Sequence, residues 1–238
     1  MNGFHAIVAV AAVVAGAIAS VAGFGIGSIL TPLLMMRVDP KVAVAAVSIP
    51  HLVATALRFW MLRTSLDRRV LLRFGLTSAA GGLLGALAHS LIGGRTLTII
   101  LGAILIFTGA VGVLGINLRF GPGAAPVAGF FSGLLGGLVG NQGGIRTGAM
   151  LGFDVPKEAF VATSTAVGLV VDGARMPVYV WQEGARLLPL RTTILIMTAG
   201  VIIGTLLGRA ALGRIPETAF KRIVSALVLL LGIVLLVF

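Results

Sequence analysis

The stretch from Gly133 to Gly152 constrains the fold of this chain more than any other segment. Its flanks are apolar enough to lie in lipid, but its centre combines polar residues with closely spaced glycines, which weaken a regular helix. Irregular backbone at membrane depth persists only where protein or a water-filled cavity satisfies its amides, and an arginine in hydrocarbon costs about 2.5–3.5 kcal/mol on insertion scales. The segment therefore predicts a polar pocket inside a membrane protein.

Composition assigns the chain to the integral membrane proteins. Hydrophobic residues make up 58% and charged residues 11% of the chain, with a mean hydropathy of +1.12, whereas charged residues make up about 25% of a soluble domain. The chain has no cysteine and its three histidines show no metal-ligand spacing, so we expect no metal and no other cofactor. The net charge of +11 comes from basic residues between apolar runs, which is typical of positive-inside loops, and we exclude nucleic acid as a partner.

The second half of the chain repeats the pattern of the first. We therefore predict an all-α integral membrane protein with two repeats, residues 1–118 and 119–238, each of about four hydrophobic units. Interrupted segments in corresponding positions of two halves indicate a transporter's binding site, so we expect broken half-helices at both glycine motifs. The features that align are Gly23–Gly27 with Gly140–Gly144, Pro40 and Lys41 with Pro156 and Lys157, Ser48 with Ser164, and Gly81-x3-Gly85 with Gly200-x3-Gly204.

Basic residues predict how the two repeats are oriented. Five arginines from Arg58 to Arg73 indicate a cytoplasmic loop. The turn after the third long helix carries Arg95 alone in the first half, whereas the equivalent turn carries four basic residues from Arg209 to Arg222. These two turns should face opposite sides of the membrane, which favours inverted repeats.

The glycine motifs resemble those of a known family. The run Gly23–Gly27 followed by Thr31–Leu34, with a second copy from Gly140 to Gly144, is similar to motifs of the TauE/SafE sulfite exporters, also called the toluene sulfonate uptake permease family. The second copy reads Gly-Asn-Gln-Gly-Gly and, with Phe160–Thr165 and Val171–Arg175, resembles one subgroup of that family.

This resemblance covers nearly the full length of the chain. It implies a multi-pass permease of the bacterial cytoplasmic (inner) membrane that moves sulfite, sulfonates or related small organic anions. The chain departs from the usual motifs at Ile26, where the family has a central glycine, and at Ala149, where it has proline. The resemblance therefore predicts the class of substrate more strongly than its identity.

Arg146 is the leading candidate for binding such an anion. An oxyanion needs directed N–H donors and positive potential, and a guanidinium supplies both without changing its protonation. Arg146 is the only charged residue between Phe120 and Gly152. The alternative is that Arg146 snorkels or pairs with a backbone carbonyl, and that its polar neighbours only satisfy the broken backbone or their own helix. The other substrate-binding candidates are Asn141, Gln142, Thr147, Gly143, Gly144, Gly25, Gly27, Ser28, Thr31 and Ser164.

Asp172, Arg175 and His51 are candidates for coupling or gating. Asp172 and Arg175 lie three residues apart on one helix face, where Asp172 either neutralises Arg175 or exchanges a proton or an ion-pair partner during transport. His51 either carries a proton near neutral pH or is only hydrogen-bonded. We further expect His89 to be solvated near a helix end. The aromatic residues expected at the membrane boundary are Trp60, Tyr179 and Trp181.

Together these features favour a secondary transporter for small anions that works by alternating access with ion coupling. The alternatives are an anion channel and a membrane-embedded enzyme or assembly subunit. Against the enzyme, the sequence shows no convergent acid, base and nucleophile, and it has no GxxxxGK[ST] loop for ATP. The expected partners are the small anion and the lipid bilayer, and a homodimer is left open.

Overall fold

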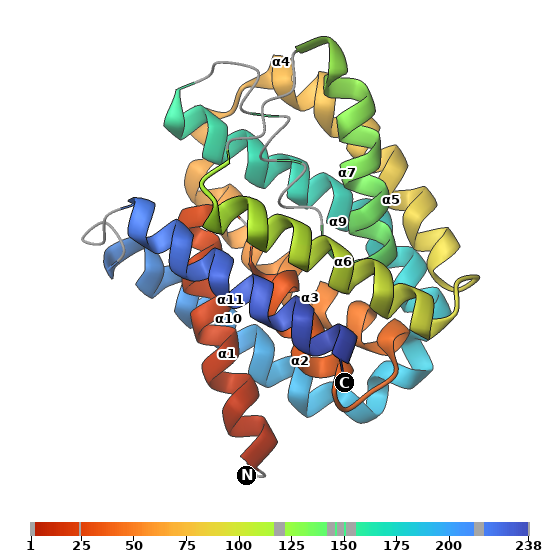
Figure 1. Cartoon of the computed structure of the whole chain (residues 1–238). Helices are drawn as coiled ribbons and strands as arrows, with labels where there is room; N and C mark the ends of the chain where they lie inside the picture. The colour runs from red at the N-terminus through yellow and green to blue at the C-terminus, as the bar shows by residue number, and fades with distance from the viewer. Residues whose placement is uncertain are drawn as a thin grey trace.

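The computed structural model describes residues 3–23, 25–116, 122–141, 146, 150, 156–211 and 217–237, and every regular element in these ranges is helical. Figure 1 shows these helices packed against one another in a single bundle, which confirms the predicted all-α class. The long helices are α1 (Gly3–Ala22), α2 (Ile26–Met35), α3 (Pro40–Leu62), α5 (Leu76–His89), α6 (Gly94–Val113), α7 (Ala125–Val139), α9 (Lys157–Leu187), α10 (Arg191–Ala211) and α11 (Glu217–Val237). The short elements are α4 (Arg68–Val70), the π-helix η2 (Leu71–Gly75) and the 3₁₀ turns η1 (Arg63–Ser65), η3 (Pro122–Ala124) and η5 (Leu188–Leu190).

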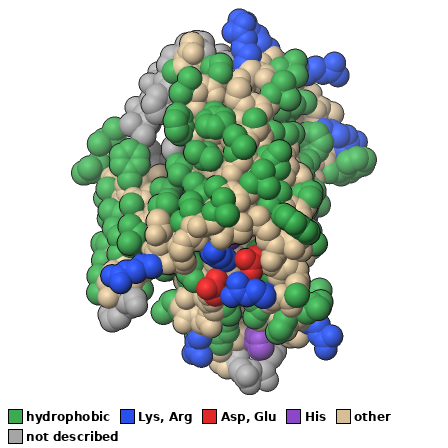
Figure 2. Space-filling view, turned by 90° about the vertical axis from the view of Figure 1, so that its right-hand side faces the viewer, with side chains coloured by type: hydrophobic (Ala, Val, Ile, Leu, Met, Phe, Trp, Pro, Cys, Tyr) green, Lys and Arg blue, Asp and Glu red, His purple; other side chains and the backbone are tan. Residues whose placement is uncertain are grey.

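Five stretches of the described residues are long and apolar enough to cross a membrane. A span of about 20 apolar residues matches the hydrocarbon thickness of a bilayer. Figure 2 shows hydrophobic side chains over most of the middle of one face, with Lys and Arg in its upper and lower parts. The chain is thus a multi-pass membrane protein. The five stretches are Gly3–Ser20, Pro40–Ser65, Arg68–His89, Gly94–Val113 and Ala159–Gly208, of which the last includes most of α9 and most of α10.

Glycines allow two helix pairs to pack closely. A Cβ at Gly81 of α5 would overlap with the carbonyl oxygen of Phe130 in α7, and a Cβ at Gly204 of α10 would overlap with that of Val13 in α1. The close contact expected of the two Gly-x3-Gly motifs is therefore present in both halves. Each pair joins a helix of the first half to one of the second.

Helices at corresponding positions of the two halves run in opposite directions. In the interface between α3 and α9, Ser48 lies against Met176, whereas Thr55 faces Gly168, so the two helices are antiparallel. The proposed repeat makes α3 the counterpart of α9. An inverted repeat requires this opposed direction, so the packing supports the proposal.

Helices α6 and α11 also pack in an antiparallel arrangement. A Cβ at Gly102 would lie 2.5 Å from a side-chain carbon of Leu236, whereas a Cβ at Gly109 would lie 2.6 Å from the amide nitrogen of Leu229. These helices are also counterparts in the proposed repeat and are also antiparallel. The repeat boundaries at residues 118 and 119 stay a prediction.

Both glycine motifs interrupt helices. Helix α1 ends at Ala22, and α2 begins at Ile26 after Gly23 and Gly25, whose φ angles of 76° and 132° suit glycine alone. Helix α7 ends at Val139, and Gly140 follows in the left-handed conformation with φ 74°. The expected break in the first motif is confirmed, and α7 likewise ends at the second motif, although the segment that follows it there, 142–145, lies outside the described residues.

Candidate functional site

A polar cluster lies between α3 and α9 in the centre of the bundle. On α3, His51, Thr55 and Arg58 share one face, because their spacing of four and three residues matches the helical turn. On α9, Asp172 and Arg175 face them, and both are buried. The cluster therefore combines polar side chains from both halves of the chain.

Asp172 is the centre of this cluster. Its Oδ2 lies 2.6 Å from Nδ1 of His51, and its Oδ1 accepts a hydrogen bond from Nε of Arg175 at 3.0 Å and forms an ion pair with Nη2 at 2.7 Å. A buried carboxylate persists only when it is paired and hydrogen-bonded, and these two partners provide that. The shared face of Asp172 and Arg175 was predicted from their spacing, whereas the contact with His51 was not.

Three side chains donate hydrogen bonds to carbonyls in the last turn of α7, where the helix stops. Arg175 Nη1 donates to the carbonyl of Gly136 at 2.5 Å, and Tyr179 Oη donates to that of Gly137. His89 Nδ1 donates to the carbonyl of Leu138 at 2.7 Å. Positive charge at a helix C-terminus is stabilised by the helix dipole, so Arg175 favours the break electrostatically.

Two expectations for these side chains were wrong. Tyr179 was expected at the membrane boundary and His89 to be solvated, but both are fully buried, with ring centroids 5.2 Å apart. Tyr179 Oη and His89 Nδ1 instead bind carbonyls at the end of α7, and His89 Nε2 lies 3.2 Å from the carbonyl of Lys41. Trp60 and Trp181 are exposed.

The carbonyl end of α1 binds two arginines. Arg58 Nη1 donates to the carbonyl of Ala19, and Arg146 Nη2 donates to that of Gly23 at 2.9 Å. Arg58 was expected in the cytoplasmic loop, but it lies inside α3 and is only 4% exposed. It belongs to the buried cluster, and the basic loop begins at Arg63.

Arg146 keeps buried N–H groups without partners. The residue is 3% exposed, and in the described part of the structure neither Nε nor Nη1 has a hydrogen-bond partner. A Cβ at Gly168 would lie 2.9 Å from Arg146 Nη1 and 3.5 Å from Cγ2 of Thr55, so both side chains flank the same point on α9. Its hydrogen bond to the carbonyl of Gly23 fits the alternative that Arg146 only pairs with the backbone. The two nitrogens that have no partner among the described residues instead favour a bound ligand.

The two glycine motifs meet each other in the bundle. Asn141 Nδ2 donates to Ser28 Oγ at 3.2 Å, and a Cβ at Gly27 would overlap with the carbonyl oxygen of Gly140. Thr31 is buried, and its Oγ1 has no partner among the described residues. The structure thus brings together polar candidates from both motifs.

The remaining candidates are placed less fully. Ser164 is buried beside the first break, and a Cβ at Gly23 would lie 3.9 Å from its Oγ. Gly25 sits at the start of α2. Gln142, Gly143, Gly144 and Thr147 lie outside the described residues.

The chain matches the family described as Sulfite exporter TauE/SafE over residues 8–235, nearly its whole length. The chain belongs to the sulfite exporter TauE/SafE family. This is a family of membrane transporters for sulfur-containing anions. No curated protein and no solved structure gives a match to the chain.

The centre of this TauE/SafE protein carries an excess of positive charge. Three buried arginines, Arg58, Arg146 and Arg175, stand against Asp172 as the one carboxylate among the described residues of the cluster. Glu183 is also buried, but it pairs with Arg186 at 2.9 Å. The charges of Arg58 and Arg146 repel each other. An anion bound between them would relieve that repulsion.

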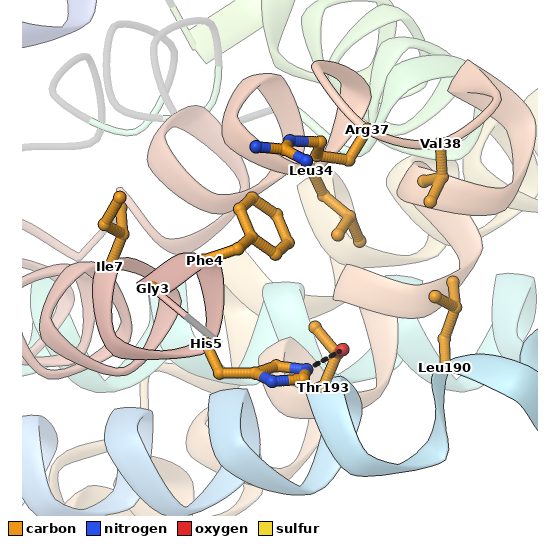
Figure 3. Close-up of a pocket in the computed structure, with 9 residues that line it drawn as sticks. All are labelled: Gly3, Phe4, His5, Ile7, Leu34, Arg37, Val38, Leu190 and Thr193. Carbon is orange, nitrogen blue, oxygen red and sulfur yellow. Dashed lines mark hydrogen bonds between the residues drawn. The ribbon is translucent and has the colours of Figure 1, made fainter. Parts of the chain in front are cut away.

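Two cavities of this TauE/SafE protein lie away from the cluster. One of about 670 Å³ lies where α1, α2 and α10 meet, and Figure 3 shows Arg37 and Phe4 on one side of it and the pair of His5 and Thr193, 3.2 Å apart, on the other. A second of about 520 Å³, lined only by apolar residues, lies between α1, α2 and α11. Neither lining includes a residue of the cluster, so neither cavity opens onto Arg146.

Proposed function

We propose that this TauE/SafE protein is a secondary permease of the bacterial cytoplasmic membrane for sulfite, sulfonates or related small anions. The observation that carries the proposal is Arg146, whose buried Nε and Nη1 have no partner in the part of the chain that the structure describes and lie in a cluster with excess positive charge. A buried donor without a partner is destabilising by about 1–3 kcal/mol, so such groups are kept where a ligand supplies the partner.

The chemistry of the cluster suits an oxyanion. A guanidinium presents its N–H groups in a planar fork that matches two oxygens of a carboxylate, sulfonate or sulfite. Charge-assisted hydrogen bonds of this kind are roughly twice as strong as neutral ones. The binding residues of the proposal are Arg146 and three polar residues of the two glycine motifs, Asn141, Ser28 and Thr31.

Alternating access is proposed because the breaks of the two halves touch at the cluster. Antiparallel counterpart helices and half-helices that meet centrally are the architecture in which one repeat rocks against the other. Gly27 and Gly140 form that contact. A channel would use the same positive site without a closed state, and it could not accumulate its anion against a gradient.

Coupling to protons is proposed for the pair His51 and Asp172. Histidine changes its charge near neutral pH, and intramembrane acids often take part in proton relays. The pair joins α3 to α9, helices of opposite halves, so its protonation would change the attraction between them.

A transport assay in proteoliposomes tests the proposal. Purified protein is reconstituted, and uptake of sulfite, ethanesulfonate and acetate is measured with and without an imposed proton gradient. We expect saturable uptake of a sulfur oxyanion, accumulation against its gradient, and loss of both in Arg146→Gln. Arg63→Gln is the control, because Arg63 is exposed and stacks on Trp60, 3.8 Å from the ring centroid. Conductive flux without accumulation would favour the channel.

A further inference from the structure

Arg58 and Arg175 make the same contact in opposite halves of the molecule. Arg58 Nη1 donates to the carbonyl of Ala19, which also accepts the N–H of Gly23 at 3.1 Å. Arg175 Nη1 donates to the carbonyl of Gly136, which also accepts the N–H of Gly140 at 3.0 Å. Each arginine therefore binds a carbonyl of a neighbouring helix, α1 or α7. In both cases this carbonyl lies four residues before the glycine that follows the helix.

The residue three positions before each arginine differs between the halves. In the second half it is Asp172, whose carboxylate receives two N–H groups of Arg175. In the first half it is Thr55, whose hydroxyl accepts one bond from Arg58 Nη2 at 3.1 Å. Arg58 Nε donates a hydrogen bond to the carbonyl of Ala54 in its own helix, at 3.4 Å. Among the described residues, Arg58 thus has no carboxylate partner, whereas its counterpart has one.

The residues that face Asp172 and Thr55 also differ, because one has a side chain and the other has none. Asp172 is faced by His51, which fills the space beside the carboxylate. Thr55 is faced by Gly168, which has no side chain, and Arg146 Nη1 lies at that point instead. At this point the structure has a glycine and the Nη1 of Arg146, which has no partner among the described residues, whereas the second half has a complete ion pair.

We infer that the transported anion binds at Arg58 as the counterpart of the Asp172 carboxylate. The oxygens of the anion accept hydrogen bonds from Arg58 and Arg146, beside Thr55 and Gly168. The anion thus pairs with Arg58 in the first half as Asp172 pairs with Arg175 in the second. This inference rests on the proposed function and narrows the ligand to anions with at least two oxygens on one face, such as a carboxylate, sulfonate or sulfite. It assigns Arg58, Thr55 and Gly168 to the site.

The test supplies the missing carboxylate from the protein itself. Thr55→Asp should pair with Arg58 as Asp172 pairs with Arg175 and should occupy the site. Thr55→Asn is the matched control, because it has nearly the shape of Asp without its charge. Binding of sodium sulfite and sodium ethanesulfonate to the full-length purified protein is measured by titration calorimetry, and folding is checked by thermal unfolding.

We expect the wild type and Thr55→Asn to bind, and Thr55→Asp to lose affinity by about tenfold or more relative to Thr55→Asn, the scale of charge-assisted hydrogen bonds. Equal affinity of the Asp and Asn variants would overturn the inference and leave the proposed function standing. A wild type that binds none of the anions, in an assay with folded protein, would instead overturn the proposed function and the inference with it.

A second pair of variants decides the question where Thr55→Asp does not fold. Gly168→Ala puts a methyl group 2.9 Å from Arg146 Nη1, in the space assigned to the anion, and should weaken binding by about tenfold. Gly173→Ala on the same helix is its control, because a Cβ there would meet no atom within 4 Å. Binding by Gly168→Ala with the affinity of Gly173→Ala would show that the anion lies elsewhere.

Discussion

His51 Nδ1 lies 2.6 Å from Asp172 Oδ2, and this contact joins α3 of the first half to α9 of the second. Through Arg175, the same carboxylate is connected to the carbonyl end of α7. A change in the charge of either residue would therefore act on the interface between the halves and on one of the two helix breaks. For this reason we propose that protonation of His51 couples anion transport to the proton gradient.

His51→Gln should uncouple transport from the proton gradient. Glutamine still donates a hydrogen bond to Asp172 but cannot take up a proton in this range. We expect gradient-driven accumulation of the anion to be lost, whereas exchange of anion across the membrane without a gradient continues. Accumulation and exchange are measured in the same proteoliposomes. Equal loss of both, or wild-type accumulation, would contradict the role of His51 in coupling.

Asp172→Asn should destabilise the protein more than His51→Gln does. The substitution leaves the buried guanidinium of Arg175 without its counter-charge, and breaking a buried pair in this way costs about 3–5 kcal/mol. The expected results are a lower yield of folded protein and a lower unfolding temperature. A double variant, Asp172→Asn with Arg175→Met, removes the unpaired charge and should recover part of the loss. No recovery would indicate that Arg175 is needed mainly at the Gly136 carbonyl.

Arg146→Lys should keep the charge at the site but lose the planar fork. Binding of the anion should weaken by about 1–3 kcal/mol, and Arg146→Gln should weaken it further. Titration of the purified variants with sulfite measures both, with Arg63→Gln as the exposed control. If folded Arg146→Gln binds its anion with unchanged affinity, Arg146 is only a partner of the Gly23 carbonyl.

Gly204→Leu should weaken the packing of α10 on α1. Even a Cβ at this position would overlap with the carbonyl oxygen of Val13, so the helices must move apart. Overpacking of this kind costs about 1–3 kcal/mol and should lower the unfolding temperature. Gly93→Leu is the control, because a Cβ at Gly93 would meet no atom within 4 Å. Similar unfolding temperatures for the two variants would show that this contact is not tight.

Single introduced cysteines should report the orientation of the chain, which has none of its own. Lys41 Nζ donates to the carbonyl of Ser90 at 2.6 Å, so the exposed Leu91 lies at the end where α3 begins, whereas Thr64 follows the end of α3 in the basic loop. A membrane-impermeant maleimide on intact cells should label Leu91→Cys. It should label Thr64→Cys only after the membrane is opened. The reverse pattern would invert the proposed topology.

Composition and local motifs were enough to predict the membrane class, the family and the break in the first glycine motif. Each of these depends on composition or on residues close together in the chain, such as Gly23 and Gly25, whose backbone angles suit glycine alone. The pairing of Asp172 with Arg175 was predicted for the same reason, since three residues on a helix bring two side chains to one face.

The contacts between side chains of different helices could not be predicted in this way. His51 and Asp172 are 121 residues apart, and their contact depends on the register of α3 against α9, which no local spacing encodes. The repeat alignment does not fix the counterpart of Arg58, because the offset of Gly23 to Gly140 pairs it with Arg175 and that of Ser48 to Ser164 pairs it with Ala174; the contacts select Arg175. Arg58 and Tyr179 have the charge and polarity of boundary residues, but in the interior they donate hydrogen bonds to carbonyls near the ends of α1 and α7.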